Sequence, residues 1–346
     1  MADMTTSRLG KAVGGSDAQA LFLRTFSGEV LAAFEEKNVM MPLHTVRTIS
    51  SGKSAQFPMT GTATAAYHVP GAEITGNAID HAERVISIDN LLLASAFISN
   101  LDEAMNHYDV RSIYSRELGY ALANHCDKAV IRSGIAGSLD TTDVMGNTAG
   151  GTQTLASNDA AGLVAKLVAT AQLFDERDVP DTDRYVIITP EMFYLLVAAA
   201  GSSGLSSAIF NNDFNGTGSI NQGRQTLQIA GMTVMMSNHI PTGDEDGSGG
   251  AVDPVLGDTS NGVRNDPFGA EGGNVGTAAG YSGVDFSNYC GLAFHRSGIG
   301  TVKLLDLAME SEYLIKHQGT LMCAKYAMGH SFLRAEACVG IKKVGG

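Results

Sequence analysis

Residues 46–118 form the stretch that most constrains how this chain can fold. Two runs of extended character, at about 44–59 and 83–98, enclose a long loop rich in Gly, Ala and Thr. In the second run Arg84, Ile86 and Ile88 alternate with the residues between them, which is the period of a β-strand. Each arm has too few apolar residues on one face to fold against its own chain. We therefore expect this hairpin to lie on another copy of the protein.

Four residues of the hairpin are our candidates for contacts with a neighbouring subunit: Phe57, Tyr67, Pro70 and Arg84. The first three supply apolar surface, and Arg84 is placed for an ion pair between subunits. Aromatic and arginine side chains often carry most of the binding energy of an interface. The alternative is an ordinary hairpin that packs on its own domain.

The apolar spacing changes to a helical period at Asp102 and keeps it to about Ile131. Asn100 followed by Glu103 resembles a capping box, which marks the start of a helix. At 1.5 Å per residue this helix would be roughly 45 Å long, well above the usual length. The segment after Ile131 is rich in Gly and Thr and is predicted to be irregular.

Alternating helical and strand patterns predict a compact mixed domain at 156–300. The patterns indicate a helix from about Ala161, a strand at 184–189, a helix that begins at Pro190 and one further strand at 227–240. The two segments after Gly298 are extended in character and are expected to pack on the long helix.

An acidic, glycine-rich segment at 242–285 is embedded in this domain. It holds twelve glycines, eight acidic residues and one basic residue, so it has too few apolar side chains to build a core. We expect an exposed insertion that either stays mobile or is ordered partly by neighbouring subunits.

Composition and charge exclude several classes of protein. The net charge of −13 argues against a nucleic-acid reader, although such a chain could surround DNA without binding it. The four cysteines are scattered, which disfavours a disulfide framework or a zinc site. The sequence has no apolar run near the ~18 residues that span a bilayer, so we expect a protein made in a cytoplasm with no membrane contact.

Motifs that suggest chemistry are incomplete. The run Gly52-Lys53-Ser54 ends like a phosphate-binding loop, but Arg47 stands where the motif needs its first glycine. Asp244 and Asp246 open like a calcium loop, but the closing carboxylate would fall at Val255. We expect neither a catalytic site nor a cofactor.

Two histidine features have plainer explanations. Glu103 and His107 lie one turn apart on the expected helix, and we interpret them as a local ion pair, since a metal site needs more ligands. His330 is interpreted as a structural residue in a glycine-flanked turn.

Several long blocks of the sequence resemble the major capsid proteins of the T-seven-like (autographivirus) group of short-tailed phages. They lie in the same order and near both ends of the chain, at residues 26–35, 46–58, 65–74, 102–112, 295–308, 324–330 and 333–337. The middle of the chain is similar to this family only in pattern.

The resemblance implies an α+β protein with the Hong Kong 97-type capsid fold. Its expected regions are an N-terminal arm (1–50), an extended loop (51–98), a peripheral domain with a long spine helix (99–155 and 301–346) and an axial domain (156–300) with the acidic loop 242–285.

It also implies a major capsid protein that assembles as hexamers and pentamers into an icosahedral head around double-stranded DNA. The expected partners are other copies of the chain, a scaffolding protein and the portal complex, and a decoration protein is a further partner that the family allows. Location would be the virion, after assembly in the bacterial host cytoplasm. Two alternatives stay open: an encapsulin-like compartment shell, and an α/β enzyme without a recognisable active site.

Overall fold

The computed structural model of the chain describes residues 38–61, 78–101, 110–141, 150–199, 227–245 and 283–344, with residues 63, 65, 67, 68, 70, 71, 73, 74, 76, 255, 256 and 281. The chain divides into two compact units. The first unit comprises residues 1–38, 90–127 and 305–328, and the second comprises 39–89, 128–304 and 329–346. The division falls within three long elements: helix α3 (Val110–Leu139) and strands β10 (Ile299–Leu314) and β11 (Gly319–Phe332).

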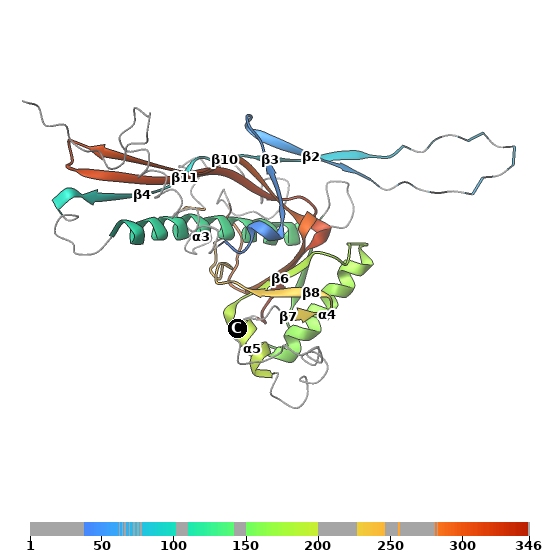
Figure 1. The fold of residues 1–346 in the computed structure, drawn as a ribbon. Coiled ribbons are helices and arrows are strands. Elements are labelled where there is room, and N and C mark those ends of the chain that lie inside the picture. Colours follow the sequence, from blue (N-terminus) through green and yellow to red (C-terminus); the bar gives the residue numbers. More distant parts are fainter. Residues whose placement is uncertain are drawn as a thin grey trace, which may run out of the picture. The chain divides into compact units, whose positions relative to one another are not determined.

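In the first unit, strand β4 (Leu92–Ser99) pairs antiparallel with β11, from Leu92 opposite Tyr326 to Ser99 opposite Gly319. Buried Met322, Ala324 and Tyr326 alternate along β11 with half-buried residues. The hydroxyl of Tyr326 donates to the Leu122 carbonyl of α3, at 3.5 Å. This face of β11 is therefore the one that packs on the helix (Figure 1).

The second unit is built on a six-stranded sheet of order β5-β12-β9-β6-β8-β7. Neighbouring strands are antiparallel except β12 with β5 and β6 with β8, which are parallel. The strands are β5 (Gly151–Thr154), β6 (Arg184–Ile188), β7 (Leu227–Ile229), β8 (Met232–Met236), β9 (Tyr289–His295) and β12 (Cys338–Lys342).

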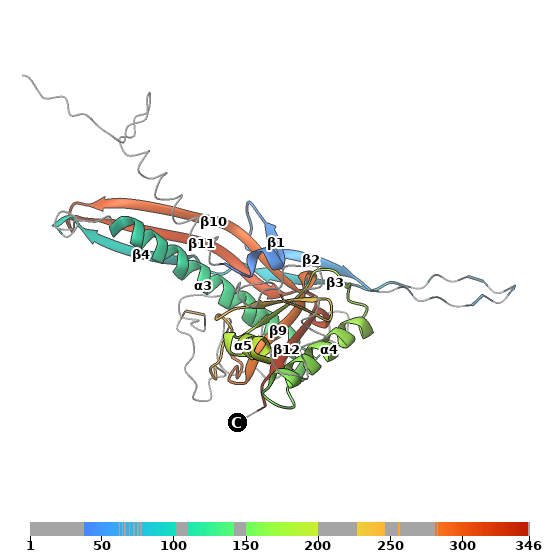
Figure 2. The same ribbon diagram turned by 60° about the horizontal axis from the view of Figure 1, so that its bottom comes forward.

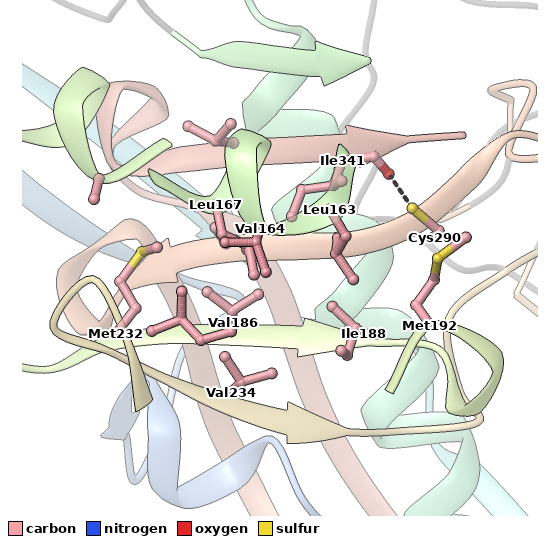
Figure 3. Packing of buried hydrophobic residues seen from close by; sticks show 14 of the residues in the cluster. Leu163, Val164, Leu167, Val186, Ile188, Met192, Met232, Val234, Cys290 and Ile341 are labelled. Carbon is pink, nitrogen blue, oxygen red and sulfur yellow. Dashed lines mark hydrogen bonds between the residues drawn. The ribbon is translucent and has the colours of Figure 1, made fainter. Parts of the chain in front are cut away.

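Each face of this sheet is covered by helix. Val186 and Ile188 of β6 pack in a cluster with residues of α4 (Ala160–Glu176) and α5 (Pro190–Ala199). Ile187, between them, packs with the C-terminal part of α3 on the opposite face. All seven residues of β9 are buried, so the core of the second unit is centred on that strand (Figures 2 and 3).

The remaining elements are short or lie at the hairpin. Strand β1 (Thr45–Thr48) pairs in parallel with the first residues of β10. Strands β2 (Ser54–Thr60) and β3 (His81–Ser87) pair with each other along their full lengths. Three 3-10 turns complete the described structure: η1 (Met41–Leu43), η4 (Arg296–Gly298) and η5 (Ala335–Ala337).

Helix α3 corrects the predicted end of the long helix. It continues to Leu139 through the glycines that were expected to end it. A Cβ on Gly134 would lie 2.4 Å from Leu292 Cδ2, and one on Gly137 would lie 2.9 Å from Phe332 Cβ. These glycines allow side chains from the strands to approach the helix closely, and that packing outweighs their low helix propensity. The predicted start at Asp102 lies outside the described residues.

Two smaller expectations are also wrong. The single strand expected at 227–240 is a hairpin, because Ala230 and Gly231 have φ values of 50° and 77° and form a tight turn between β7 and β8. His330 lies within β11 and is buried, so it is not a turn residue.

The acidic segment is held by its own chain at three of its described residues, Glu245, Leu256 and Tyr281. Buried Glu245 forms an ion pair with buried Arg132 of α3, with 2.5 Å between Oε1 and Nη2. Leu256 and Tyr281 are buried in a small cluster with Ala129. The expectation that this segment either stays mobile or is ordered partly by neighbouring subunits is therefore wrong for Glu245, Leu256 and Tyr281, which are held by their own chain.

Candidate subunit interface

The hairpin of β2 and β3 has one covered face and one open face. The register places Ala55, Phe57 and Met59 directly opposite Ile86, Arg84 and Ala82, so these six residues share a face. Each of them is buried or half-buried, whereas Gln56, Pro58, Glu83 and Val85 on the other face are exposed. The alternation that predicted strands therefore also predicts which face is covered.

Two of the predicted contact residues lie on the covered face and opposite each other, Phe57 and Arg84. The guanidinium of Arg84 lies 3.9 Å from the ring centroid of Phe332, in β11. Arg47 lies 5.6 Å from the ring centroid of Phe57. Both side chains thus have partners in their own chain, and cation–π contacts of this kind stabilise by about 0.5–1 kcal/mol or more.

The hairpin base packs on β10 and β11 within the second unit, which corrects one premise drawn from the sequence. Ile86 is fully buried, and a Cβ on Gly300 of β10 would lie 3.1 Å from its Cδ1. Gly329 of β11 lies so close to the hairpin that a Cβ there would be 2.0 Å from the Ser87 carbonyl oxygen. The expectation that the arms cannot fold against their own chain is therefore wrong for their base.

The other two predicted residues, Tyr67 and Pro70, lie in the loop between the strands, where every described residue from 63 to 80 is exposed. The relative exposure of Tyr67 is 106%, and that of Ile74, which the sequence analysis did not single out, is 80%. The signal that could have found Ile74 is its position as a branched apolar residue in a loop of small and polar ones. The structure thus separates the four candidates into a covered pair and an exposed pair.

Backbone hydrogen bonds hold the two ends of the hairpin strands. Ile88 N–H donates to the Lys53 carbonyl at 2.9 Å, and Gly61 N–H donates to the Asp80 carbonyl at 2.9 Å. Gly52 has a φ of 115°, a conformation that favours glycine, and the chain then enters β2. A phosphate-binding loop would lead into a helix, so Gly52, Lys53 and Ser54 form a strand entry.

The described residues contain no cluster suited to metal chemistry. No group of three or more His, Cys, Asp or Glu side chains among them is placed to hold a metal ion. Asp244 pairs with Asp285 through an isolated β-bridge, while Asp246, Glu103 and His107 lie outside the described residues. Burial raises the pKa of the Cys290 thiol to about 11, so this thiol is a packing group and not a nucleophile. Within the described part of the chain, no helix combines the length and the apolar character needed to cross a membrane.

Comparison with solved structures defines the class of protein. The capsid structure of the cyanophage P-SCSP1u matches with a TM-score of 0.70 and 34% sequence identity, covering 100% of both chains. The chain has the Hong Kong 97-type fold of a phage capsid subunit, and its fold class is α+β as predicted.

The chain belongs to the Gp10A-like major capsid protein family, whose model matches residues 56–342. It is 35% identical to the major capsid protein of Enterobacteria phage T3, over 96% of this chain and 94% of that protein. It is 36% identical to the major capsid protein of Escherichia phage T7, over 94% of this chain and 92% of that protein.

These matches identify a structural protein of the virion shell, which assembles with other copies of itself and is not an enzyme. The predicted resemblance to the major capsid proteins of T-seven-like phages is confirmed. The alternatives of a cellular compartment shell and an α/β enzyme are set aside. The four regions predicted by residue range describe roles in an assembled shell, and they stay predictions.

Proposed function

We propose that the loop of the β2–β3 hairpin binds a neighbouring copy of the chain in the same capsomer. The observation that carries the proposal is the exposure of Tyr67 and Ile74, at 106% and 80%, on a loop whose strands are anchored to their own chain. An exposed aromatic ring on a tethered loop gains about 2 kcal/mol or more when a partner buries it. Pro70, also exposed, would add apolar surface beside it.

Phe57 and Arg84 have a different role from Tyr67 in this proposal. Since both lie on the covered face, they position the loop from within the chain. The expected ion pair between Arg84 and a neighbouring subunit stays a proposal beside its contact with Phe332.

The capsomers would be hexamers and pentamers that close an icosahedral head around double-stranded DNA. Head-to-tail contacts of this kind close by rotation, so one tethered loop per subunit completes a ring and does not continue into a fibre. The net charge of −13 fits a container that encloses DNA without binding its sequence. A scaffolding protein, the portal complex and a decoration protein remain proposed partners, and the host cytoplasm remains the proposed place of assembly.

Such a shell would hold together without covalent links through the loop. Residues 54–100 contain no lysine, and Lys53 lies at the hairpin base, where its carbonyl accepts the bond from Ile88. Boiling mature particles in detergent should release a single monomer band, and a ladder of multimers would contradict this expectation.

The proposal is tested by replacing residues 60–80 with a short Gly-Ser linker. We expect a folded subunit that does not assemble, and normal shells from this variant would disprove the proposal. A finer version changes Tyr67 and Ile74 to Ser, which should raise the concentration needed for assembly at least tenfold, or ~1.4 kcal/mol per subunit. The matched control changes Ala63 and Ala65 to Ser in the same loop and should assemble normally.

A further inference from the structure

A line of hydrogen bonds between buried side chains runs through the second unit beside the hairpin. His44, which follows η1, approaches the Met40 carbonyl oxygen with Nδ1 at 2.7 Å. Its Nε2 lies 2.6 Å from the Thr301 hydroxyl of β10. That hydroxyl lies 2.8 Å from Nδ1 of His330 in β11. Relative exposure is 2% or less for these three side chains, so water does not compete for their bonds.

The line continues from β11 to the end of the hairpin through Tyr281, a residue of the acidic segment. The backbone N–H of His330 donates to the Tyr281 hydroxyl at 3.0 Å. The same hydroxyl donates to Oδ2 of Asp89, at 2.5 Å. Asp89 lies two residues beyond the end of β3. The ring of Tyr281 also lies against that of His330, with 5.9 Å between centroids.

The chemistry of the partners fixes where the protons lie. A carbonyl oxygen can only accept, so Nδ1 of His44 carries a proton and donates to Met40. Nε2 of neutral His44 then accepts from the Thr301 hydroxyl, whose oxygen is left to accept from Nδ1–H of His330. Every donor therefore has an acceptor when both imidazoles are neutral.

We propose that these five side chains, His44, Thr301, His330, Tyr281 and Asp89, form a lock that fixes the hairpin base to the rest of the second unit, and that protonation of His330 opens it. The lock holds the base from two sides, since Gly329 brings the β11 backbone against Ser87 while Tyr281 bonds Asp89. The inference concerns contacts within one chain, so it stands independently of what the hairpin loop binds.

A proton taken up from water would bind at Nε2 of His330 and create an imidazolium in a fully buried place. Burial, with the nearby His44 and Lys303 acting in the same direction, lowers the pKa of His330 to about 3. The Tyr281 hydroxyl connects Asp89 to the backbone N–H of His330. Opening the lock exposes the imidazole to water and restores its ordinary basicity, so acid favours the open state.

Amide hydrogen exchange on the full-length chain, corrected for intrinsic rates, measures the opening. We expect the protection of residues 85–89, including the bond from Ile88 to Lys53, to fall about tenfold between pH 7.5 and pH 5.5. This factor follows from a His330 pKa of about 3 in the locked state and ~6.5 in the open state. Protection of Val186–Ile188 in β6 should stay constant. The assembly state is checked at each pH by light scattering.

Two variants separate the lock from general acid effects. His330→Asn keeps an N–H near the Nδ1 position for Thr301 but cannot titrate, so protection at 85–89 should not change with pH. Tyr281→Phe keeps the ring and loses the hydroxyl, so exchange at 85–89 should already be about tenfold faster at pH 7.5. Matched controls are His317→Asn and Tyr185→Phe, whose side chains take no part in the lock.

The same acid response in His330→Asn as in the unaltered chain would overturn the proposal. So would unaltered protection in Tyr281→Phe at pH 7.5, a variant that still tests the lock if His330→Asn fails to fold. Equal loss of protection in β6 and at 85–89 would also overturn it, because the event would then be general unfolding.

Discussion

Strand β9 and the loop between β2 and β3 are both rich in apolar and small residues, yet they have opposite surroundings. All seven residues of β9 are buried, between β6 and β12 of its own chain. In the loop every described residue from 63 to 80 is exposed, including Tyr67 and Ile74. The difference separates the part of the chain that builds the subunit core from the part that we propose contacts its neighbours. Changes in β9 should affect folding first, and changes in the loop should affect assembly alone.

The largest expected effect lies in the core. Phe294→Ala in β9 removes a fully buried ring that packs near Tyr185, so it should lower the free energy of unfolding by about 3–5 kcal/mol. Urea denaturation of the unassembled chain measures this loss. The control, Phe97→Ala, removes a ring that is 47% exposed and should cost much less. If both variants lost the same unfolding free energy, the difference in burial between Phe294 and Phe97 would not determine their contribution to stability.

The second effect tests whether the acidic segment belongs with the core or with the exposed loop. Glu245→Gln leaves the Arg132 guanidinium buried without its carboxylate, which should cost about 3 kcal/mol in unfolding free energy. It should also speed proteolysis within 242–285. The double variant Arg132→Met with Glu245→Leu should recover most of that stability, because it removes both buried charges. If Glu245→Gln were as stable as the unaltered chain, the ion pair between Arg132 and Glu245 would not contribute to the stability of the subunit.

The third effect is the pH dependence of stability. The pKa of His330 is lowered in the folded chain, so between about 3 and 6.5 the unfolded state binds more protons and stability falls as the pH falls. This contribution is fully present above ~6.5 and should decrease by about 1.4 kcal/mol at pH 5.5. Urea midpoints at pH 7.5 and pH 5.5 measure the change, and His330→Asn should show a smaller one. An identical decrease in that variant would assign the effect to other groups.

The smallest effect on folding is expected in the loop itself. Tyr67→Ser should change the free energy of unfolding of the unassembled chain by no more than about 0.5 kcal/mol, because its exposed ring has little packing to lose. The urea midpoint should match that of the unaltered chain within error. A loss near that of Phe294→Ala would mean that the loop packs on its own subunit in solution, and the comparison would fail.

Sequence periodicity predicted the elements that depend on local pattern. The alternation in β2 and β3, the helical spacing of α4 and Pro190 at the start of α5 all appear in the structure. These elements could be predicted because each buries one face whose spacing is visible along the chain.

The remaining features depend on residues that are distant in sequence. Gly134 and Gly137 look like helix breakers until the strands that approach them are known. Likewise, the contact of Arg84 with Phe332 could not be predicted, because Phe332 lies near the other end of the chain. The candidate interface was therefore predictable as a hairpin, but the partners of its covered residues within the chain were not.

The contact proposed for the hairpin loop can be tested most directly by the accessibility of Tyr67 before and after shell assembly. Tyr67→Cys is made in a Cys323→Ser background, since Cys126, Cys290 and Cys338 are buried. Maleimide labelling at position 67 is then followed by peptide mass spectrometry. We predict rapid labelling of the unassembled subunit and at least tenfold slower labelling in the shell. Equal labelling rates in both states would contradict the claim that a neighbouring subunit covers this loop.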